Sequence, residues 1–124
     1  IRHMDEYVPE DENFGDEAPY NVDPNDFVKY ISEAAYVCTD SFHCTVFSIL
    51  FHRQFMTFYR FAEGSKTERN SRINSLFGLF GLQERLYQMD IDRITNLIDY
   101  NAVDEKLAAL RKDSIAFLDG CLRP

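Results

Sequence analysis

Four side chains that can ligate metals fall close together in this chain, namely Cys38, His43, Cys44 and His52. Strong zinc signatures use closely paired ligands such as C-x-x-C, whereas Cys38 and His43 are five residues apart. On a continuous helix, Cys44 and His52 would lie about 80° apart, and His43 and His52 would face opposite sides. The ligands therefore do not converge, and the sequence predicts no metal site.

Other residue pairs that could carry catalysis have simpler structural explanations. Cys44 lies next to His43 but inside an apolar stretch, whereas a catalytic cysteine needs an exposed, electropositive setting. Asp90 and Asp92 stand where a helix is expected to begin, and helix capping explains both. We therefore expect no catalytic residues, no cofactor and no enzymatic activity.

A basic stretch interleaved with aromatic residues is the most prominent candidate surface. Residues 53–72 carry five bases against two acids, a local net charge of +3. Such a surface can hold an acidic peptide or an acidic helix, and bases beside aromatic rings can also stack on single-stranded RNA. Alternatively, the aromatic rings point inward and the arginines only cover the rim of the core. We predict the partner-binding residues to be Arg53, Tyr59, Arg60, Lys66, Arg69 and Arg72.

These bases surround an aromatic-rich segment that we expect to be a central helix over residues 42–62. Phe47, Phe51, Phe55 and Phe58 fall at helical spacing on one stripe. Two strands are the competing interpretation, because residues 45–51 and 55–61 are rich in strand formers. The intervening His52-Arg53-Gln54 contains no Gly, Pro or Asn and makes a poor hairpin loop, so the pattern favours the helix.

The rest of the chain reads as further short helices. Asp23 and Pro24 begin one that continues to about Thr39, and a capping-box pattern at Ser65 begins another that ends near Gly81. In the helix that ends near Gly81, the residues expected to point inward are Ile73, Leu76, Phe77 and Phe80. Further helices are expected at 83–89, from Asp90, and from Val103 to Gly120. In the helix from Asp90, the residues expected to point inward are Ile91, Ile94, Leu97 and Ile98. The predicted fold is all-α, a compact bundle of five or six short helices around the aromatic-rich helix.

Charge and composition divide the chain. Residues 1–4 resemble a tag or cloning remnant, residues 5–22 form an acidic flexible tail, and residues 23–124 form the helical domain. Residues 1–23 carry a net charge of −7, which leaves −1 for residues 24–124. The tail could dock on its own domain, dock on a partner or stay disordered. Strong duplex binding needs a concentrated basic footprint that this chain lacks, so nucleic acid is an unlikely partner.

The chain's surroundings follow from its apolar runs and its cysteines. No apolar run approaches the ~18 residues that span a bilayer, and the acidic first twenty residues do not resemble a signal peptide. An odd count of three cysteines favours free thiols in a reducing compartment, so we expect an intracellular protein of the cytoplasm or nucleus.

The expected function is a non-enzymatic protein–protein interaction or homodimerisation module, an adaptor or scaffold domain. The aromatic-rich helix offers more apolar surface than five short neighbours should cover, which favours association with another protein, a peptide or a second copy. The alternative is an RNA-associated helical scaffold that uses the basic 53–72 segment. A third interpretation is an enzyme whose active site leaves no pattern in the sequence.

Overall fold

The computed structural model describes residues 21–59 and 70–123. Within them the chain forms four α-helices, two strands and two short 3-10 helices. In chain order these are α1 (Pro24–Glu33), β1 (Tyr36–Thr39), α2 (Phe42–Leu50), β2 (Gln54–Thr57), α3 (Ser71–Phe80), η2 (Gln83–Arg85), η3 (Ile91–Thr95) and α4 (Tyr100–Leu122). The expected all-α bundle of five or six helices is therefore wrong, although the described part is mostly helical.

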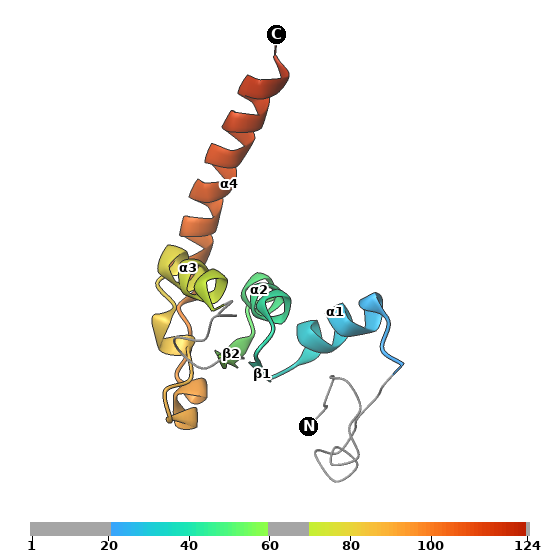
Figure 1. Cartoon of the computed structure of the whole chain (residues 1–124), viewed down its shortest axis with the longest axis vertical. Helices are drawn as coiled ribbons and strands as arrows, with labels where there is room; N and C mark the ends of the chain where they lie inside the picture. Colours follow the sequence, from blue (N-terminus) through green and yellow to red (C-terminus); the bar gives the residue numbers. More distant parts are fainter. Residues whose placement is uncertain (1–20, 60–69, 124) are drawn as a thin grey trace.

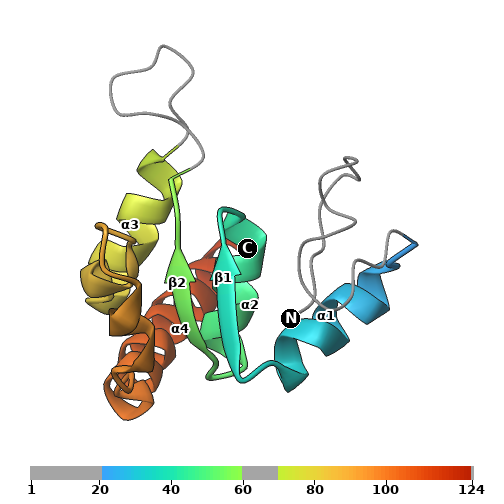
Figure 2. The ribbon, with the colours of Figure 1, turned by 90° about the horizontal axis from the view of Figure 1, so that it is seen from below.

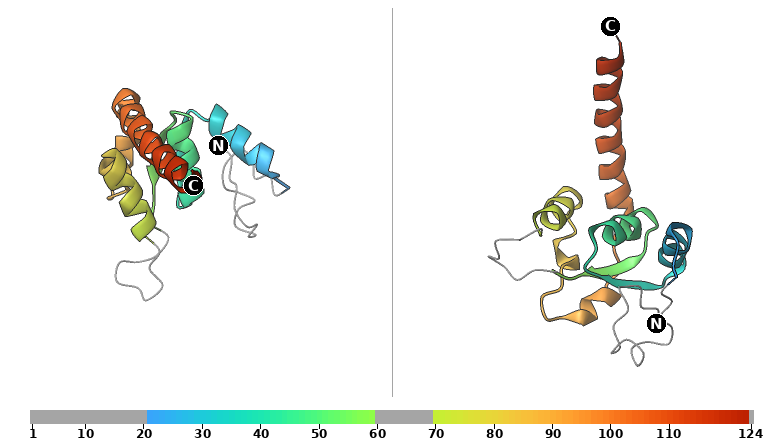
Figure 3. Two further views of the ribbon diagram at one scale, coloured as in Figure 1. Left: turned by 90° about the horizontal axis from the view of Figure 1, so that it is seen from above. Right: turned by 45° about the vertical axis from the view of Figure 1, so that its right-hand side comes forward.

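A β-α-β unit lies at the centre of the molecule. β1 and β2 pair in parallel, from Tyr36 opposite Gln54 to Thr39 opposite Thr57, and α2 makes the crossover between them. Two parallel strands need such a crossover, because the end of the first strand and the beginning of the second lie at opposite edges of the sheet. Leu86 extends the pairing through an isolated parallel bridge to Thr57. Figure 3 shows α2 over one face of the strand pair, with α1 and α3 on either side of it.

The expected central helix over residues 42–62 stops after three turns. His52 adopts a left-handed φ of 54°, and the Arg53 amide donates to the Ser48 carbonyl at 2.8 Å. This is the backbone closure that normally uses glycine after a helix. The chain then enters β2, so Phe55 lies on a strand and does not share a helical stripe with Phe47. The alternative with strands over residues 45–51 and 55–61 was correct for residues 55–57, whereas residues 45–50 belong to α2.

The first expected helix also ends early. Asp23 caps α1 as predicted, since its carboxylate accepts from the Asn25 and Asp26 amides at 2.7 and 2.8 Å. The helix ends at Glu33, and residues 36–39, expected to be helical, form β1. Val37 on this strand is buried opposite Phe55 of β2. Pairing with β2 therefore gives strand structure to a segment that helical spacing had assigned to the first helix.

In the described residues after β2, some helices end where they were predicted to end and others are shorter than predicted. α3 ends as predicted, with Gly81 at φ 72° and the Leu82 amide donating to the Phe77 carbonyl at 3.0 Å. The helices expected at 83–89 and from Asp90 are shortened to η2 and η3. Buried Arg85 joins these two, since its guanidinium donates to the carbonyls of Arg93 and Asn96 at 3.0 and 2.7 Å.

The last helix is present as expected and extends a few residues beyond the predicted Val103 and Gly120 at both ends. α4 begins at Tyr100, capped by Asp99, and runs through Gly120 to Leu122. Val103 in its first turns is buried at 2% exposure, whereas residues 111–123 are exposed throughout. Figure 1 shows this distal half projecting away from the body. Among the helices described, none combines the length and the apolar character needed to cross a membrane.

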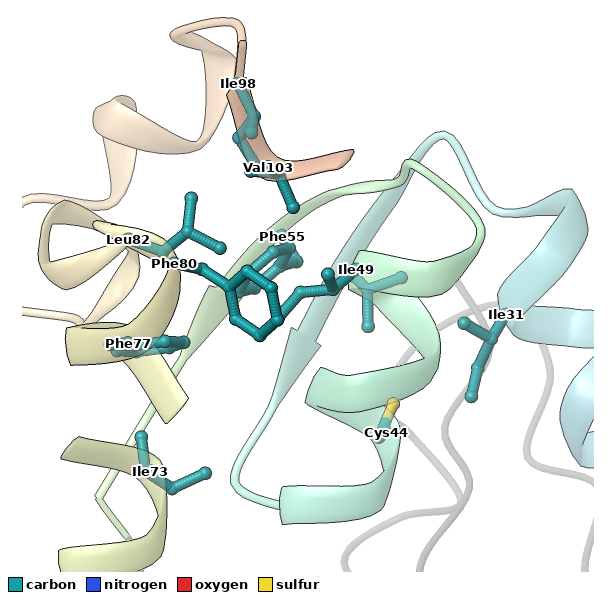
Figure 4. Packing of buried hydrophobic residues seen from close by; sticks show 11 residues of the cluster. Ile31, Cys44, Ile49, Phe55, Ile73, Phe77, Phe80, Leu82, Ile98 and Val103 are labelled. Carbon is teal, nitrogen blue, oxygen red and sulfur yellow. The ribbon is translucent and has the colours of Figure 1, made fainter. Parts of the chain in front are cut away.

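The hydrophobic core lies between the strands, α2, α3 and the first turns of α4. Phe55 and Phe77 are the largest apolar side chains that are almost fully buried, with ring centroids 6.1 Å apart. Figure 4 shows Ile49, Phe80, Leu82, Ile98 and Val103 gathered around them. Ile73, Phe77, Phe80 and Ile98 were predicted to point inward and are buried, but Ile91 and Leu97 were also expected inside and are exposed.

Candidate functional site

The carboxyl ends of β1 and β2 lie side by side and open onto the same edge of the molecule. The last strand pair is Thr39 with Thr57, and the Phe58 amide still donates to the Thr39 carbonyl at 2.8 Å. In Figure 2 both strands rise toward the edge from which the chain enters α2. In open α/β sheets, ligands bind in the crevice outside the carboxyl ends of the strands. We call this edge the strand-end site.

The turn from β1 into α2 is held by hydroxyl groups. The Ser41 hydroxyl accepts from the Cys44 amide at 3.4 Å, and the Thr39 hydroxyl accepts from the Ser41 amide at 3.0 Å. Thr45 donates from its hydroxyl to the Ser41 carbonyl at 2.9 Å. These bonds fix the N-terminus of α2 at the strand-end site, where the positive end of a helix dipole favours negative charge.

Two ring side chains stand on the first turn of α2. Phe42 is half-buried and His43 is exposed, and their ring centroids lie 5.8 Å apart in an edge-on contact. The side chain of Asp40, in the turn itself, is also half-buried. An exposed imidazole is the side chain best suited to exchange protons near neutral pH. His43 is therefore the strongest candidate for proton transfer at this edge.

The opposite wall of the site comes from the first half of α3. The Tyr59 hydroxyl donates to the Asn74 side-chain oxygen at 2.5 Å, which ties the segment after β2 to α3. Across the gap between the two helices, the Arg72 guanidinium carbon lies 5.2 Å from the centroid of the Phe42 ring. α2 and α3 thus contribute a ring and a cation that face each other.

A hollow of about 280 Å³ opens between these two helices. Its lining combines one aromatic and two aliphatic side chains with two hydroxyls and one cation: Phe42, Leu76, Leu79, Ser71, Ser75 and Arg72. Such a mixture of apolar surface and a few polar groups is typical of sites for small molecules.

The structure brings together only part of the predicted basic surface. Tyr59 and Arg72 lie at the strand-end site, whereas Arg53 precedes β2 at the opposite end of that strand. The half-buried Arg53 donates from Nε to the Phe51 carbonyl at 2.7 Å, so its guanidinium helps to hold the turn after α2. Arg60, Lys66 and Arg69 lie outside the described residues. Protein or peptide binding by the six residues stays a prediction.

The cysteine and histidine side chains do not form a common site. His52 lies with Arg53 away from the strand ends, where its Nε2 contacts Asp104 Oδ1 at 3.0 Å. Partial burial raises the pKa of the Cys38 thiol although the residue is exposed, and burial raises the pKa of the Cys44 thiol, so neither is activated as a thiolate. Among residues 21–59 and 70–123, no three or more histidine, cysteine or acidic side chains gather as metal ligands would.

Sequence reasoning missed the strand-end site because it continued the first helix to about Thr39 and began the aromatic-rich helix at residue 42, which left no strand between them. The missed signal was the strand-forming run Tyr36-Val37-Cys38-Thr39 directly before Asp40 and Ser41. A strand that ends in small polar residues and leads into a helix is the beginning of a β-α-β unit.

Comparison with known proteins gives one match. The family model for polysaccharide pyruvyl transferases matches residues 2–60, which is 59 of the 124 residues. The matched part includes α1, β1, α2 and β2 and ends three residues after β2. Neither a curated protein nor a solved structure gives a significant match.

This match contradicts the functional expectations drawn from the sequence. A pyruvyl transferase is an enzyme, so the expectation of a chain without enzymatic activity is overturned, together with the adaptor, scaffold and homodimerisation interpretation. The RNA-associated scaffold finds no support either. Those expectations gave weight to an aromatic-rich helix that the structure divides between α2 and β2.

Proposed function

We propose that this chain is part of a transferase of the polysaccharide pyruvyl transferase type, and that its strand-end site binds reactants. The observation that carries the proposal is where the family match falls. It covers the whole β1–α2–β2 unit, whose carboxyl edge is the expected position for a ligand in a parallel sheet. The hydroxyl-rich turn, His43 and Arg72 supply polar chemistry at that edge.

The chemistry of pyruvyl transfer suits these groups. When the enol phosphate of pyruvate is the donor, two acceptor hydroxyls form C–O bonds to its central carbon and the C–O bond to phosphate breaks. One hydroxyl proton is taken up by the enol CH2 carbon, which becomes a methyl group, and the other leaves with inorganic phosphate. Each attacking hydroxyl must therefore give up its proton. His43 is exposed at the edge and can take that proton as a general base. The pyruvyl group carries a carboxylate, which the N-terminus of α2 and the Arg72 guanidinium both favour electrostatically.

A transfer assay with two matched histidine variants tests this proposal. The protein is incubated with a bacterial polysaccharide and the radiolabelled enol phosphate of pyruvate, and label in the polymer is counted. Loss of a general base typically slows a reaction by about 10²–10⁴-fold, which is the expected effect of His43→Gln. His52→Gln serves as the control, because His52 lies away from the strand-end site.

Two results would contradict the proposal. If no polysaccharide in a panel becomes labelled, the transferase assignment is wrong. Equal labelling by the wild type and His43→Gln would leave the transferase in place and remove His43 as its base.

We also propose an intracellular location. The free, exposed thiols of Cys38 and Cys121 support it, because reducing compartments keep such thiols from forming disulfides. Thiol labelling of the protein in intact and in lysed cells checks this proposal. A thiol reagent that cannot cross membranes should react with the protein only after the cells are lysed.

A further inference from the structure

The contact between Arg72 and Phe42 holds a guanidinium group in a defined position. Arg72 stands on the first turn of α3, is exposed, and lies 5.2 Å from the Phe42 ring centroid. A guanidinium that rests on an aromatic face keeps the N–H groups at its own edge available for hydrogen bonds. Those edges match a carboxylate in a two-pronged geometry.

The surroundings of Arg72 define the size of what it can bind. The hollow measures about 280 Å³, at the lower limit of the roughly 300–1,000 Å³ found for small-molecule sites. The hollow is open to solvent, and its volume is sufficient for a group of a few heavy atoms. Leu76 and Leu79 offer apolar contacts, and the hydroxyls of Ser71 and Ser75 stand at its polar side.

The hollow adjoins the strand-end site. Phe42 belongs to both, since it lines the hollow and is the first residue of α2 after the β1 turn. On the α3 side, Asn74 accepts the hydrogen bond from Tyr59 while its neighbour Ser75 lines the hollow. A small group held in the hollow would thus lie next to the edge where His43 stands.

We propose that the hollow between α2 and α3 is the subsite for the pyruvyl group, an inference that rests on the proposed transferase function. The Arg72 guanidinium binds the carboxylate, and Leu76 and Leu79 contact the methyl end of this three-carbon unit. The Phe42 ring keeps the guanidinium in place. Ser71 and Ser75 offer hydroxyl donors to the remaining oxygen.

Nuclear magnetic resonance titration of the full chain with pyruvate tests the subsite directly. Saturable shifts are expected for the amides of Phe42 and of residues 71–79. Pyruvamide, a neutral analogue of the same shape, should bind at least about ten-fold more weakly, because it cannot form the charge-assisted hydrogen bonds of a carboxylate with the guanidinium. D-glucuronate, a carboxylate from a sugar source, should also bind more weakly than pyruvate.

Matched arginine variants assign the effect to one side chain. Arg72→Gln should weaken pyruvate binding about ten-fold or more, and Arg72→Lys should restore only part of it because lysine lacks the planar fork. Arg111→Gln, on the exposed distal part of α4, should bind pyruvate as the wild type does. Arg72 is exposed, so these variants are expected to fold, and far-UV circular dichroism checks that they do.

The outcomes separate this inference from the proposed function. Equal pyruvate affinity for the wild type and Arg72→Gln, or tighter binding of glucuronate than of pyruvate, would overturn the subsite. Arg72-dependent pyruvate binding without any polysaccharide labelling would support the subsite while contradicting the transferase function. Labelling that is unaffected by Arg72→Gln would keep the function and overturn the subsite.

Discussion

Two threonine hydroxyls join α2 to β2 inside the core. Thr45 and Thr57 are fully buried and their hydroxyl oxygens lie 3.0 Å apart. Thr45 also donates its single hydroxyl proton to the Ser41 carbonyl, so the proton between the two threonines comes from Thr57. The two positions therefore respond differently when the hydroxyl is removed.

We predict that Thr45→Val destabilises the protein more than Thr57→Val. The first change leaves the Thr57 hydroxyl buried without its Thr45 acceptor, at a cost of about 1–3 kcal/mol. In Thr57→Val the Thr45 hydroxyl keeps the Ser41 carbonyl, and the expected loss stays below about 1 kcal/mol. Urea unfolding of both variants and of the double variant measures this. Equal losses for the two single variants would contradict the assignment of the protons.

Tyr100 makes the free energy of unfolding depend on pH in the alkaline range. Its hydroxyl donates to the Arg53 carbonyl, and burial raises its pKa above the ordinary value of 10.0. The unfolded chain then loses the phenolic proton before the folded chain does, so this contribution is complete below about pH 10 and is lost as pH rises further. Thermal unfolding between pH 8 and 11 should show the decline, and Tyr100→Phe should flatten it. Tyr36→Phe, at an exposed tyrosine, should leave the decline unchanged.

At the scale of elements, α2 and α3 end with the same backbone closure, but only the closure after α3 can be predicted from the sequence. Gly81 supplies the left-handed position after α3, and His52 supplies it after α2. Histidine is more common there than most residues, yet it is not a sequence signal that ends a helix. In the folded chain the His52 ring stacks on Tyr100, with centroids 4.6 Å apart, and its Nε2 contacts Asp104. These contacts come from α4, about fifty residues later in the chain.

We predict that His52→Val destabilises the protein clearly more than His52→Gly. A β-branched residue held at positive φ costs about 1–3 kcal/mol, whereas glycine adopts this conformation freely. Both variants lose the contacts to Tyr100 and Asp104. The difference between their free energies of unfolding therefore measures the cost of the left-handed backbone conformation at this position. Chemical denaturation measures both. If valine were as stable as glycine, the left-handed turn that separates α2 from β2 would not form in solution.

At the scale of the whole molecule, the distal half of α4 stands apart from the core. Leu107 and Leu110 still pack against the core, but residues 111–123 are exposed, including Phe117 at 70%. An isolated helix of this length is only marginally stable in water. The body should therefore keep its stability without the distal half.

We predict that deletion of residues 113–124 changes the free energy of unfolding by no more than about 0.5 kcal/mol, as for exposed positions generally. Val103→Ala, near the start of the same helix, should cost about 0.5–3 kcal/mol because its side chain is buried. Differential scanning calorimetry compares the two, and hydrogen exchange should be fast for amides beyond residue 112. A truncation as costly as Val103→Ala would mean that the distal helix is packed in solution.

The sequence by itself determined the features that depend on neighbouring residues. The Asp23 cap, the Gly81 closure and the inward stripe of Ile73, Phe77 and Phe80 were all predicted and are confirmed. Each is a local effect, in which a side chain or a backbone preference acts within about two turns. At the site, the sequence singled out Tyr59 and Arg72 as binding residues, but it could not show that Tyr59 bonds to Asn74 or that Arg72 lies over the Phe42 ring.

The tertiary structure alone decided whether residues 36–39 and 54–57 are strands. Both segments fit helical spacing, and each becomes a strand because it pairs with the other in parallel, with Val37 and Phe55 buried at the pairing. That pairing places Thr39 beside Thr57 and so creates the strand-end site, which the strand-forming run 36–39 could only hint at before its partner strand was known. Neighbouring residues select helices and caps, whereas strand pairing and the sites it builds depend on contacts between distant parts of the chain.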